Sequence, residues 1–305
     1  MNLFLTGATG FIGGSIAHHL TQTGHQVRGL IRNPADADAV ASLGIVPVVG
    51  SLDDAALLRQ EAQASDGVIN AADSMHRAGL EALIDGLRGS GKPLLHTSGI
   101  GMVSRDVAGD HTVDQIADDA EPVAPGPHPA QHALREQERR ALGAVTQGVR
   151  VVVLSNSLIY GTGMGVARDS VQVPMMLRIA QQTGEARFVG HGLNRWSTVH
   201  IADMSTLYRL ALEGAPAGSF YFVENGEVAF AEIAAAIGRR LGLGEPHGWS
   251  LDEASAMLGE MPARFLLGSD ARVRGTAARR DLGWYPSRMS VTDWITTEMP
   301  LPQHA

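Results

Sequence analysis

The chain has 305 residues, 44% of them hydrophobic and 18% charged, so it can bury a large core and is neither disordered nor collagen-like. No apolar run reaches the roughly 18 residues of a membrane span, and a formal charge of -8 disfavours polyanions, so we expect no membrane and no nucleic-acid partner. Cysteine is absent, which excludes disulfides, thiolate nucleophiles and cysteine-ligated metals.

The first half of the chain alternates short β-branched or apolar runs with amphipathic stretches. This alternation is typical of parallel strands joined by crossover helices. In chain order, strands are expected at 2–6, 27–32, 46–50, 66–72, 93–99 and 149–161, with helices at 11–22, 53–62, 75–91 and 130–145. The sequence therefore predicts an α/β fold, a Rossmann-type doubly wound parallel sheet.

The regular alternation of strand and helix patterns ends after about Gly165. Helices are expected at 173–184, from about Asp203, at 230–243 and at 251–259, with a strand at 220–225. We predict a dinucleotide-binding domain over 1–165, to which 198–225 returns, and a smaller substrate-binding region made of 166–197 and 226–305. The long proline-containing stretch at 104–131 is typical of a lid or binding loop.

Three glycines lie where the first strand gives way to a helix, in TGATGFIG. Gly7 permits a tight turn, Gly10 lets backbone approach a diphosphate, and Gly13 lets the helix pack against the sheet. The helix N-terminus then offers free N–H groups and a partial positive charge to an anion. The motif predicts dinucleotide binding. Because the chain starts directly before it, we expect no secretory leader and a cytoplasmic protein.

The end of the second strand bears on which dinucleotide is bound. Sites that prefer NAD place an acid there to hold the ribose 2′-hydroxyl, whereas this chain has Ile31, Arg32 and Asn33. Arg32, together with Arg28, could hold a 2′-phosphate through paired N–H groups. We favour NADP over NAD as the cofactor.

TGATGFIGG and the strand–helix order resemble the extended short-chain dehydrogenase/reductase superfamily, in its NAD-dependent epimerase/dehydratase-like group. Supporting segments are VVGSLDD, VINAA, HTSGIGMV, LIYGTGMG and GHGLNRWSTVHIADM. The resemblance implies a Rossmann domain, a small C-terminal substrate domain, a small-molecule substrate and a homodimer. The cofactor-binding residues that the motifs and the resemblance indicate are Gly7, Thr9, Gly10, Phe11, Ile12, Gly13, Arg32, Ser51, Leu52, Ala71, Ala72, Asn156 and Ser157.

The chain departs from this superfamily at its acid–base pair, a tyrosine followed four residues later by a lysine that lowers the tyrosine pKa. The only lysine is Lys92, and none of the four tyrosines precedes a lysine at that spacing. Counting back from the sixth strand puts His128 and His132 at the two positions. Matching Glu138 to the helix glutamate of the family puts Ala130 and Leu134 there instead, and the sequence does not decide between the two registers.

Three residues are candidates for catalytic roles in the absence of that pair. Ser98 lies in the serine motif, one residue before the usual catalytic position, which is Gly99 here, and its hydroxyl could polarise a carbonyl through a hydrogen bond. His132 could orient ribose or donate a proton, because imidazole titrates near neutrality. Tyr160 lies at the expected nicotinamide end. His128 and His132 also have the spacing of a metal pair, but no third ligand is marked, so no metal is expected.

These observations leave three functions open. The leading one is an NADP-dependent oxidoreductase that acts on a small carbonyl or hydroxyl substrate with a nonstandard proton donor, with Arg195 and Trp196 holding an anionic or aromatic part of the substrate. An NAD(P)-dependent sugar-nucleotide epimerase or dehydratase is the second. The third is a non-catalytic NADP(H)-binding sensor, since the fold alone does not establish chemistry.

Overall fold

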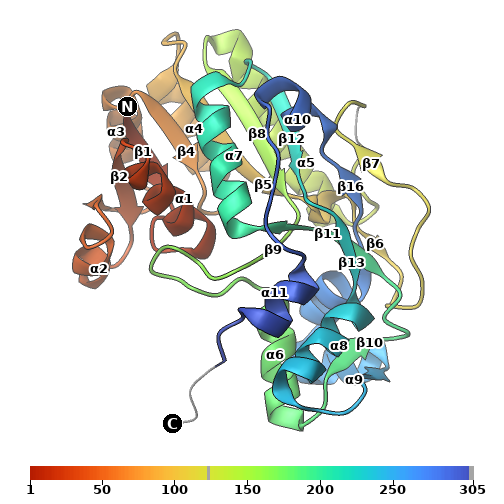
Figure 1. Cartoon of the computed structure of the whole chain (residues 1–305). Coiled ribbons are helices and arrows are strands. Elements are labelled where there is room, and N and C mark those ends of the chain that lie inside the picture. Colours follow the sequence, from red (N-terminus) through yellow and green to blue (C-terminus); the bar gives the residue numbers. More distant parts are fainter. Residues whose placement is uncertain (122–123, 302–305) are drawn as a thin grey trace.

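Seven parallel strands form the central sheet of the computed structural model, which describes residues 1–121 and 124–301 (Figure 1). Their order across the sheet is β12-β8-β5-β4-β1-β2-β3. The strands are β1 (Asn2–Thr6), β2 (Gln26–Ile31), β3 (Ile45–Val49), β4 (Gly67–Asn70), β5 (Pro93–Gly99), β8 (Arg150–Asn156) and β12 (Ser219–Val223). The order reverses beside β1, and in open α/β sheets ligands bind outside the carboxyl ends of the strands at such a point.

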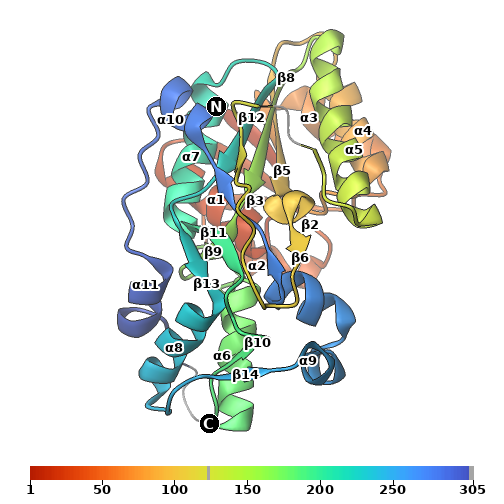
Figure 2. The same cartoon turned by 90° about the vertical axis from the view of Figure 1, so that its right-hand side faces the viewer.

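Helices cover both faces of this sheet, as Figure 2 shows with the sheet seen between them. One face packs against α1 (Phe11–Gln22), α2 (Ala37–Ala41) and α7 (Ile201–Gly214). The other packs against α3 (Ala55–Ala64), α4 (Arg77–Leu87) and α5 (Pro129–Gly143). Alternate residues of each strand, such as Leu94 and Leu95 in β5, enter the two cores. The doubly wound sheet predicted from the sequence is confirmed.

A third core lies beyond one end of the sheet, in the lower part of Figure 1. It is built mainly from α6 (Gln172–Thr183), α8 (Phe230–Leu241), α9 (Leu251–Leu258), α11 (Val291–Thr297), β10 (Arg187–Val189) and β14 (His247–Trp249). A three-stranded sheet of β9 (Leu158–Tyr160), β11 (Arg195–His200) and β13 (Glu227–Ala229) joins it to the central sheet.

Most expected elements differ from the observed ones by a few residues at their ends, and two of the differences have a clear structural reason. The strand predicted over 149–161 splits in two, because β9 leaves the central sheet after Ser157 and pairs with β11 instead. The helix expected to carry Asp53 and Asp54 in its first turn begins only at Ala55. The carboxylate of Asp54 caps it by accepting the N–H of Leu57 at 3.0 Å.

Two short strand pairs help to attach the described part of the stretch from Ser104 to Gln131 to the C-terminal part of the chain. Within it, β6 (Arg105–Asp106) pairs with β15 (Ser269–Asp270), and β7 (Ala117–Asp118) pairs with β16 (Val273–Arg274), which precedes α10 (Thr276–Leu282). None of the helices in the described part of the chain combines the length and apolar character that crossing a bilayer requires.

Candidate functional site

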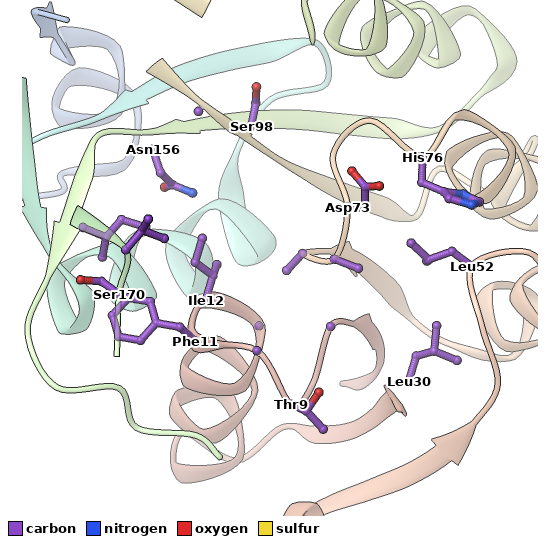
Figure 3. A pocket seen from close by; sticks show the side chains of 18 of the residues that line it. Thr9, Phe11, Ile12, Leu30, Leu52, Asp73, His76, Ser98, Asn156 and Ser170 are labelled. Carbon is purple, nitrogen blue, oxygen red and sulfur yellow. The ribbon is translucent and has the colours of Figure 1, made fainter. Parts of the chain in front are cut away.

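A cavity of about 640 Å³ opens at the carboxyl ends of the strands, on both sides of the point where the strand order reverses (Figure 3). One end lies by β2 and β3 and is called the β2 end below; the other lies by β5 and β8 and is called the β5 end. Ser98 lines this cavity, and so do all the residues that sequence analysis assigned to the cofactor. These cofactor residues are Gly7, Thr9, Gly10, Phe11, Ile12, Gly13, Arg32, Ser51, Leu52, Ala71, Ala72, Asn156 and Ser157.

The glycine turn in the middle of the cavity leaves no room for side chains. A Cβ on Gly13 would lie 2.3 Å from the carbonyl oxygen of Gly7, and a Cβ on Gly7 would lie 2.8 Å from the carbonyl oxygen of Ala71. Gly7 also has a φ of +81°, which L side chains rarely adopt. Gly10 begins α1 without a side-chain cap. The first-turn N–H groups therefore remain available to an anion, and the cradle fits a dinucleotide diphosphate.

A buried network of polar side chains lies beside the glycine turn. The Thr6 hydroxyl donates to Asn70 Oδ1 at 2.7 Å and accepts the N–H groups of Ala71 and Ala72. Asn70 Nδ2 lies 3.2 Å from His96 Nδ1, so the histidine accepts and carries its proton on Nε2. Burial lowers the pKa of His96 to about 4. The network is therefore uncharged near neutral pH and holds the chain beside the cradle by hydrogen bonds alone.

Arg32 is exposed at the β2 end of the cavity. Arg28, its expected companion, faces Glu61 instead, with its Nε and Nη2 atoms 2.6 and 2.7 Å from the two carboxylate oxygens. The Asn33 side chain caps the turn after β2 by accepting the N–H of Ala35. Of the two arginines in question, Arg32 is therefore the one that lies where a phosphate on the cavity side of β2 would bind.

A histidine and an aspartate at the same end were not predicted. His76 Nδ1 accepts the N–H of Gly79, so its proton lies on Nε2, which is 3.1 Å from the carboxylate of Asp53. Both residues line the cavity, and the Asp53 side chain is 86% exposed. They come from separate elements, the start of α3 and the start of α4, so no spacing in the sequence links them.

At the β5 end, Ser98 connects the cavity to a buried carboxyl group and the arginine beside it. Its hydroxyl donates to Glu138 Oε1 at 2.6 Å, and the other carboxylate oxygen of Glu138 lies 2.8 Å from Arg135. Glu138 is fully buried on α5. Burial raises the pKa of its carboxyl group, and the hydrogen bonds from Ser98 and Arg135 partly oppose this effect.

Asn156 lies beside Gly99 in the register of β5 and β8. Its Nδ2 donates to the buried hydroxyl of Tyr208 at 2.9 Å, and that hydroxyl donates to Thr97 at 3.0 Å. Asn156 Oδ1 and the Ser157 hydroxyl are buried without a partner among the described residues. Both residues line the cavity, where a water molecule or a polar group of a ligand could supply the missing partner.

Two proton-donor candidates lie outside the cavity. His132 is on the exposed face of α5, whereas Glu138 of the same helix faces the sheet. Tyr160 is fully buried and its hydroxyl donates to the carbonyl of Met289. Because successive residues of a strand point to opposite sides, Ile159 lines the cavity and Tyr160 faces away. Burial, with the charges of Asp203 and Asp293, raises the pKa of Tyr160.

The two residues expected to hold substrate are also placed elsewhere. Arg195 lies between the carboxylates of Glu227 and Glu232, at 3.4 and 3.3 Å. Trp196 is buried, and its indole N–H donates to the carbonyl of Ser269 at 2.9 Å. Both side chains are therefore used in holding β11 to its neighbours.

The cavity is completed by residues for which sequence analysis gave no role. They are Leu30, Asp53, Asp73, His76, Gly99, Ile159, Asp169, Ser170, Val171 and Gln172. The last four follow the GTGMG segment, whose glycines allow the chain to return against α1, where Gly165 meets Gly14 backbone to backbone. The glycine-rich segment is the feature of the sequence from which this part of the cavity lining could have been predicted.

Comparisons with known proteins identify the family of this chain. Residues 3–222 match the model of the NAD dependent epimerase/dehydratase family. Oxidase ucsJ of Acremonium sp is 32% identical, with 93% of this chain and 92% of that protein aligned. The 2-alkyl-3-oxoalkanoate reductase of Stenotrophomonas maltophilia is 29% identical, over 74% of this chain and 71% of that protein.

Among solved structures, dTDP-glucose 4,6-dehydratase of Bacillus anthracis in complex with NAD has a TM-score of 0.76 at 18% identity, covering 97% of this chain and 94% of that one, which shows a shared fold. The chain belongs to the NAD dependent epimerase/dehydratase family. It is an NAD(P)-dependent enzyme of oxidoreductase or epimerase type, which disfavours the non-catalytic hypothesis.

Proposed function

We propose that this enzyme is an NADP-dependent reductase of a small, largely apolar ketone. The observation that carries the proposal is the single cavity in which the glycine cradle, Arg32 and Ser98 meet. When bound, the nicotinamide supplies a hydride to the carbonyl carbon of the substrate. The residues of the chain bind the dinucleotide, hold the ketone beside Ser98 and provide the proton that the carbonyl oxygen needs.

The dinucleotide is proposed to lie across the sheet edge from the β2 end to the β5 end. The cradle of Gly7, Gly10 and Gly13 would hold the diphosphate, and Arg32 would hold a 2′-phosphate. Ser51 and Leu52 would flank adenine, and Ala71 and Ala72 would border the ribose. Asn156 and Ser157 would meet the nicotinamide end, where their unpartnered oxygens support such a contact.

An apolar ketone is favoured over a sugar nucleotide by the charges at the β5 end. The cavity lining there includes Ile159 and Val171, and its charged residue is Asp169, an acid. A nucleotide diphosphate would need cations, and Arg195, the residue expected to supply one, is already paired with two glutamates. The name of the Stenotrophomonas relative specifies a 2-alkyl-3-oxoalkanoate, which is a ketone with alkyl chains and a single carboxylate and so carries less negative charge than a nucleotide diphosphate.

The substrate side of the cavity is proposed to belong to a smaller region made of 166–197 and 226–305. The segment Asp169–Gln172, which precedes and opens α6, already contributes to the lining. We also propose a homodimer, which sedimentation of the purified protein tests directly.

The proposed function is tested by cofactor titration followed by a ketone screen. Purified protein is titrated with NADPH and with NADH by fluorescence, and tighter binding of NADPH is expected. NADPH oxidation is then followed with 2-alkyl-3-oxoalkanoates of increasing chain length and, separately, with UDP-glucose and dTDP-glucose. Turnover of the ketones alone supports the proposal, whereas turnover of a sugar nucleotide, or preference for NADH, contradicts it.

A further inference from the structure

Glu138 is a buried carboxyl group to which the steps described above assign no role. It lies on α5, the helix on which the missing tyrosine and lysine would stand, and its side chain is fully excluded from solvent. Ser98, whose hydroxyl it accepts at 2.6 Å, lines the cavity. The carboxyl group is therefore one hydrogen bond away from a residue on the cavity wall.

Few charges face Glu138 from the elements around it. Arg135, one helical turn earlier on α5, lies 2.8 Å from its second oxygen. On β5, His96 faces Asn70 instead. Glu81 of α4 is paired with Arg140, and Arg150 of β8 is held by carbonyl groups of α7 and the residue after it. The surroundings thus contain one cation and an apolar core, and burial favours the protonated carboxyl group.

We propose that Glu138 and Ser98 form a proton relay that takes the place of the missing tyrosine–lysine pair. The proposal rests on the function proposed above, because it supplies the proton that ketone reduction requires. Ser98 would be the catalytic residue that touches the carbonyl oxygen. Glu138 acts through it as the titratable group that stores the proton.

The proton balance of the relay is complete. As the hydride adds to the carbonyl carbon, the C=O π electron pair moves onto oxygen, and the Ser98 O–H bond breaks to protonate that oxygen. The Ser98 hydroxyl donates to Glu138 Oε1 in the structure, so it first turns its proton toward the ketone oxygen. Ser98 Oγ then takes the proton of the Glu138 carboxyl group, leaving a carboxylate paired with Arg135. After the alcohol leaves, water in the cavity returns a proton to Glu138 through the Ser98 hydroxyl, so one ketone, one hydride and one proton give one alcohol.

The relay predicts the direction in which kcat changes with pH. Only the protonated form of Glu138 can give a proton, so kcat for reduction falls as pH rises through the pKa of Glu138. Ser98 normally donates to this carboxyl group and so favours its charged form. Replacing Ser98 with alanine removes that donor and raises the pKa of Glu138, an effect that can be measured without cofactor or substrate.

The test compares Glu138→Gln with Glu136→Gln, an exposed glutamate two residues earlier on the same helix. Glu138→Gln is expected to lower kcat roughly a hundredfold, to remove the fall of kcat with pH and to leave NADPH affinity unchanged. Glu136→Gln is expected to behave as wild type. Ser98→Ala is expected to match Glu138→Gln, whereas Ser98→Thr, which keeps a hydroxyl, retains most of the activity.

A readout besides turnover is the titration of the Glu138 carboxyl carbon by NMR in cofactor-free protein. An upward pKa shift in Ser98→Ala supports the relay. Wild-type kcat with an unchanged pH profile in Glu138→Gln overturns the relay alone, as does parallel loss of NADPH affinity, melting temperature and activity, which is the result of a purely structural role. Absence of ketone turnover in the wild type, with NADPH still bound, overturns the proposed function and the relay with it.

Discussion

The two ends of the cavity are built from different parts of the chain. In the middle of the cavity the glycine turn presents backbone, because Gly7, Gly10 and Gly13 leave the amide groups of α1 bare. At the β5 end, the surface consists of side chains, and Ser98 and Asn156 are each held by a residue from another element, Glu138 and Tyr208.

The buried networks beneath the two ends differ as well. Thr6, Asn70 and His96 form an uncharged network under the cradle. Two residues after His96 on β5, Ser98 leads to a carboxyl group and a guanidinium. We infer that the cradle end serves binding, which needs a fixed shape, and that the β5 end serves chemistry, which needs a group able to gain and lose a proton.

The strongest test of the cradle end is Gly13→Ala. The added Cβ would lie 2.3 Å from the Gly7 carbonyl oxygen, so the turn has to move away from the anion that it holds. We expect NADPH affinity to fall more than a hundredfold, about 3 kcal/mol or more, measured by fluorescence titration.

Gly143→Ala is the matched control, since nothing lies within 4 Å of a Cβ added at Gly143 near the end of α5. Its NADPH affinity should equal that of the wild type. Normal NADPH binding by Gly13→Ala would mean that the diphosphate lies somewhere other than this turn, and the division of roles between the two ends would fail.

The same contrast explains how much of the molecule could be predicted. The fold follows from local signals, because buried parallel strands need continuous apolar runs and helices need their own periodicity. The strand over 149–161 was drawn too long because a change of sheet at Ser157 depends on β11, a partner far away in sequence. Strand periodicity contains no information about which sheet a strand joins.

The candidate site divides in the same way. Cradle residues could be predicted because only glycine tolerates their backbone positions, so residue type reports geometry directly. Tyr160, Arg195 and Trp196 have suitable chemistry, but tertiary contacts with Met289, Glu227 and Ser269 hold them outside the cavity. Conversely, His76 and Asp53 meet only after folding, so neither was predicted.

Cofactor choice at the β2 end is tested by Arg32→Ala. If this exposed guanidinium binds a 2′-phosphate, its loss should weaken NADPH binding roughly tenfold to a hundredfold, the range for a charge-assisted hydrogen bond. NADH binding should be unaffected. Arg88→Ala, which removes an exposed arginine at the end of α4, is the control for net charge. Equal weakening for both cofactors would argue against a 2′-phosphate contact.

The uncharged network beneath the cradle predicts a pH dependence of stability. His96 has a pKa of about 4 when folded against 6.5 ordinarily, so the unfolded chain binds the extra proton. The stabilisation that depends on a neutral His96 is fully present above pH 6.5 and is lost as pH falls toward 4, so the free energy of unfolding falls by about 2 kcal/mol between pH 7 and 5. Denaturant unfolding of His96→Gln should show a decrease between these two pH values that is smaller than the wild-type decrease by this amount. Equal slopes would mean that His96 is accessible to protons in the folded state.

Tyr160→Phe has the smallest expected effect. It tests whether Tyr160 belongs to the core behind the cavity and takes no part in binding or chemistry at either end. The hydroxyl of Tyr160 donates to the Met289 carbonyl and does not face the cavity, so its loss should cost about 1 kcal/mol of stability and leave kcat and NADPH affinity unchanged. Tyr285→Phe, at a side chain 77% exposed, should cost nothing measurable. A tenfold fall of kcat in Tyr160→Phe at constant NADPH affinity would instead make this tyrosine the proton donor, which would require β9 to turn its other face toward the substrate during the reaction.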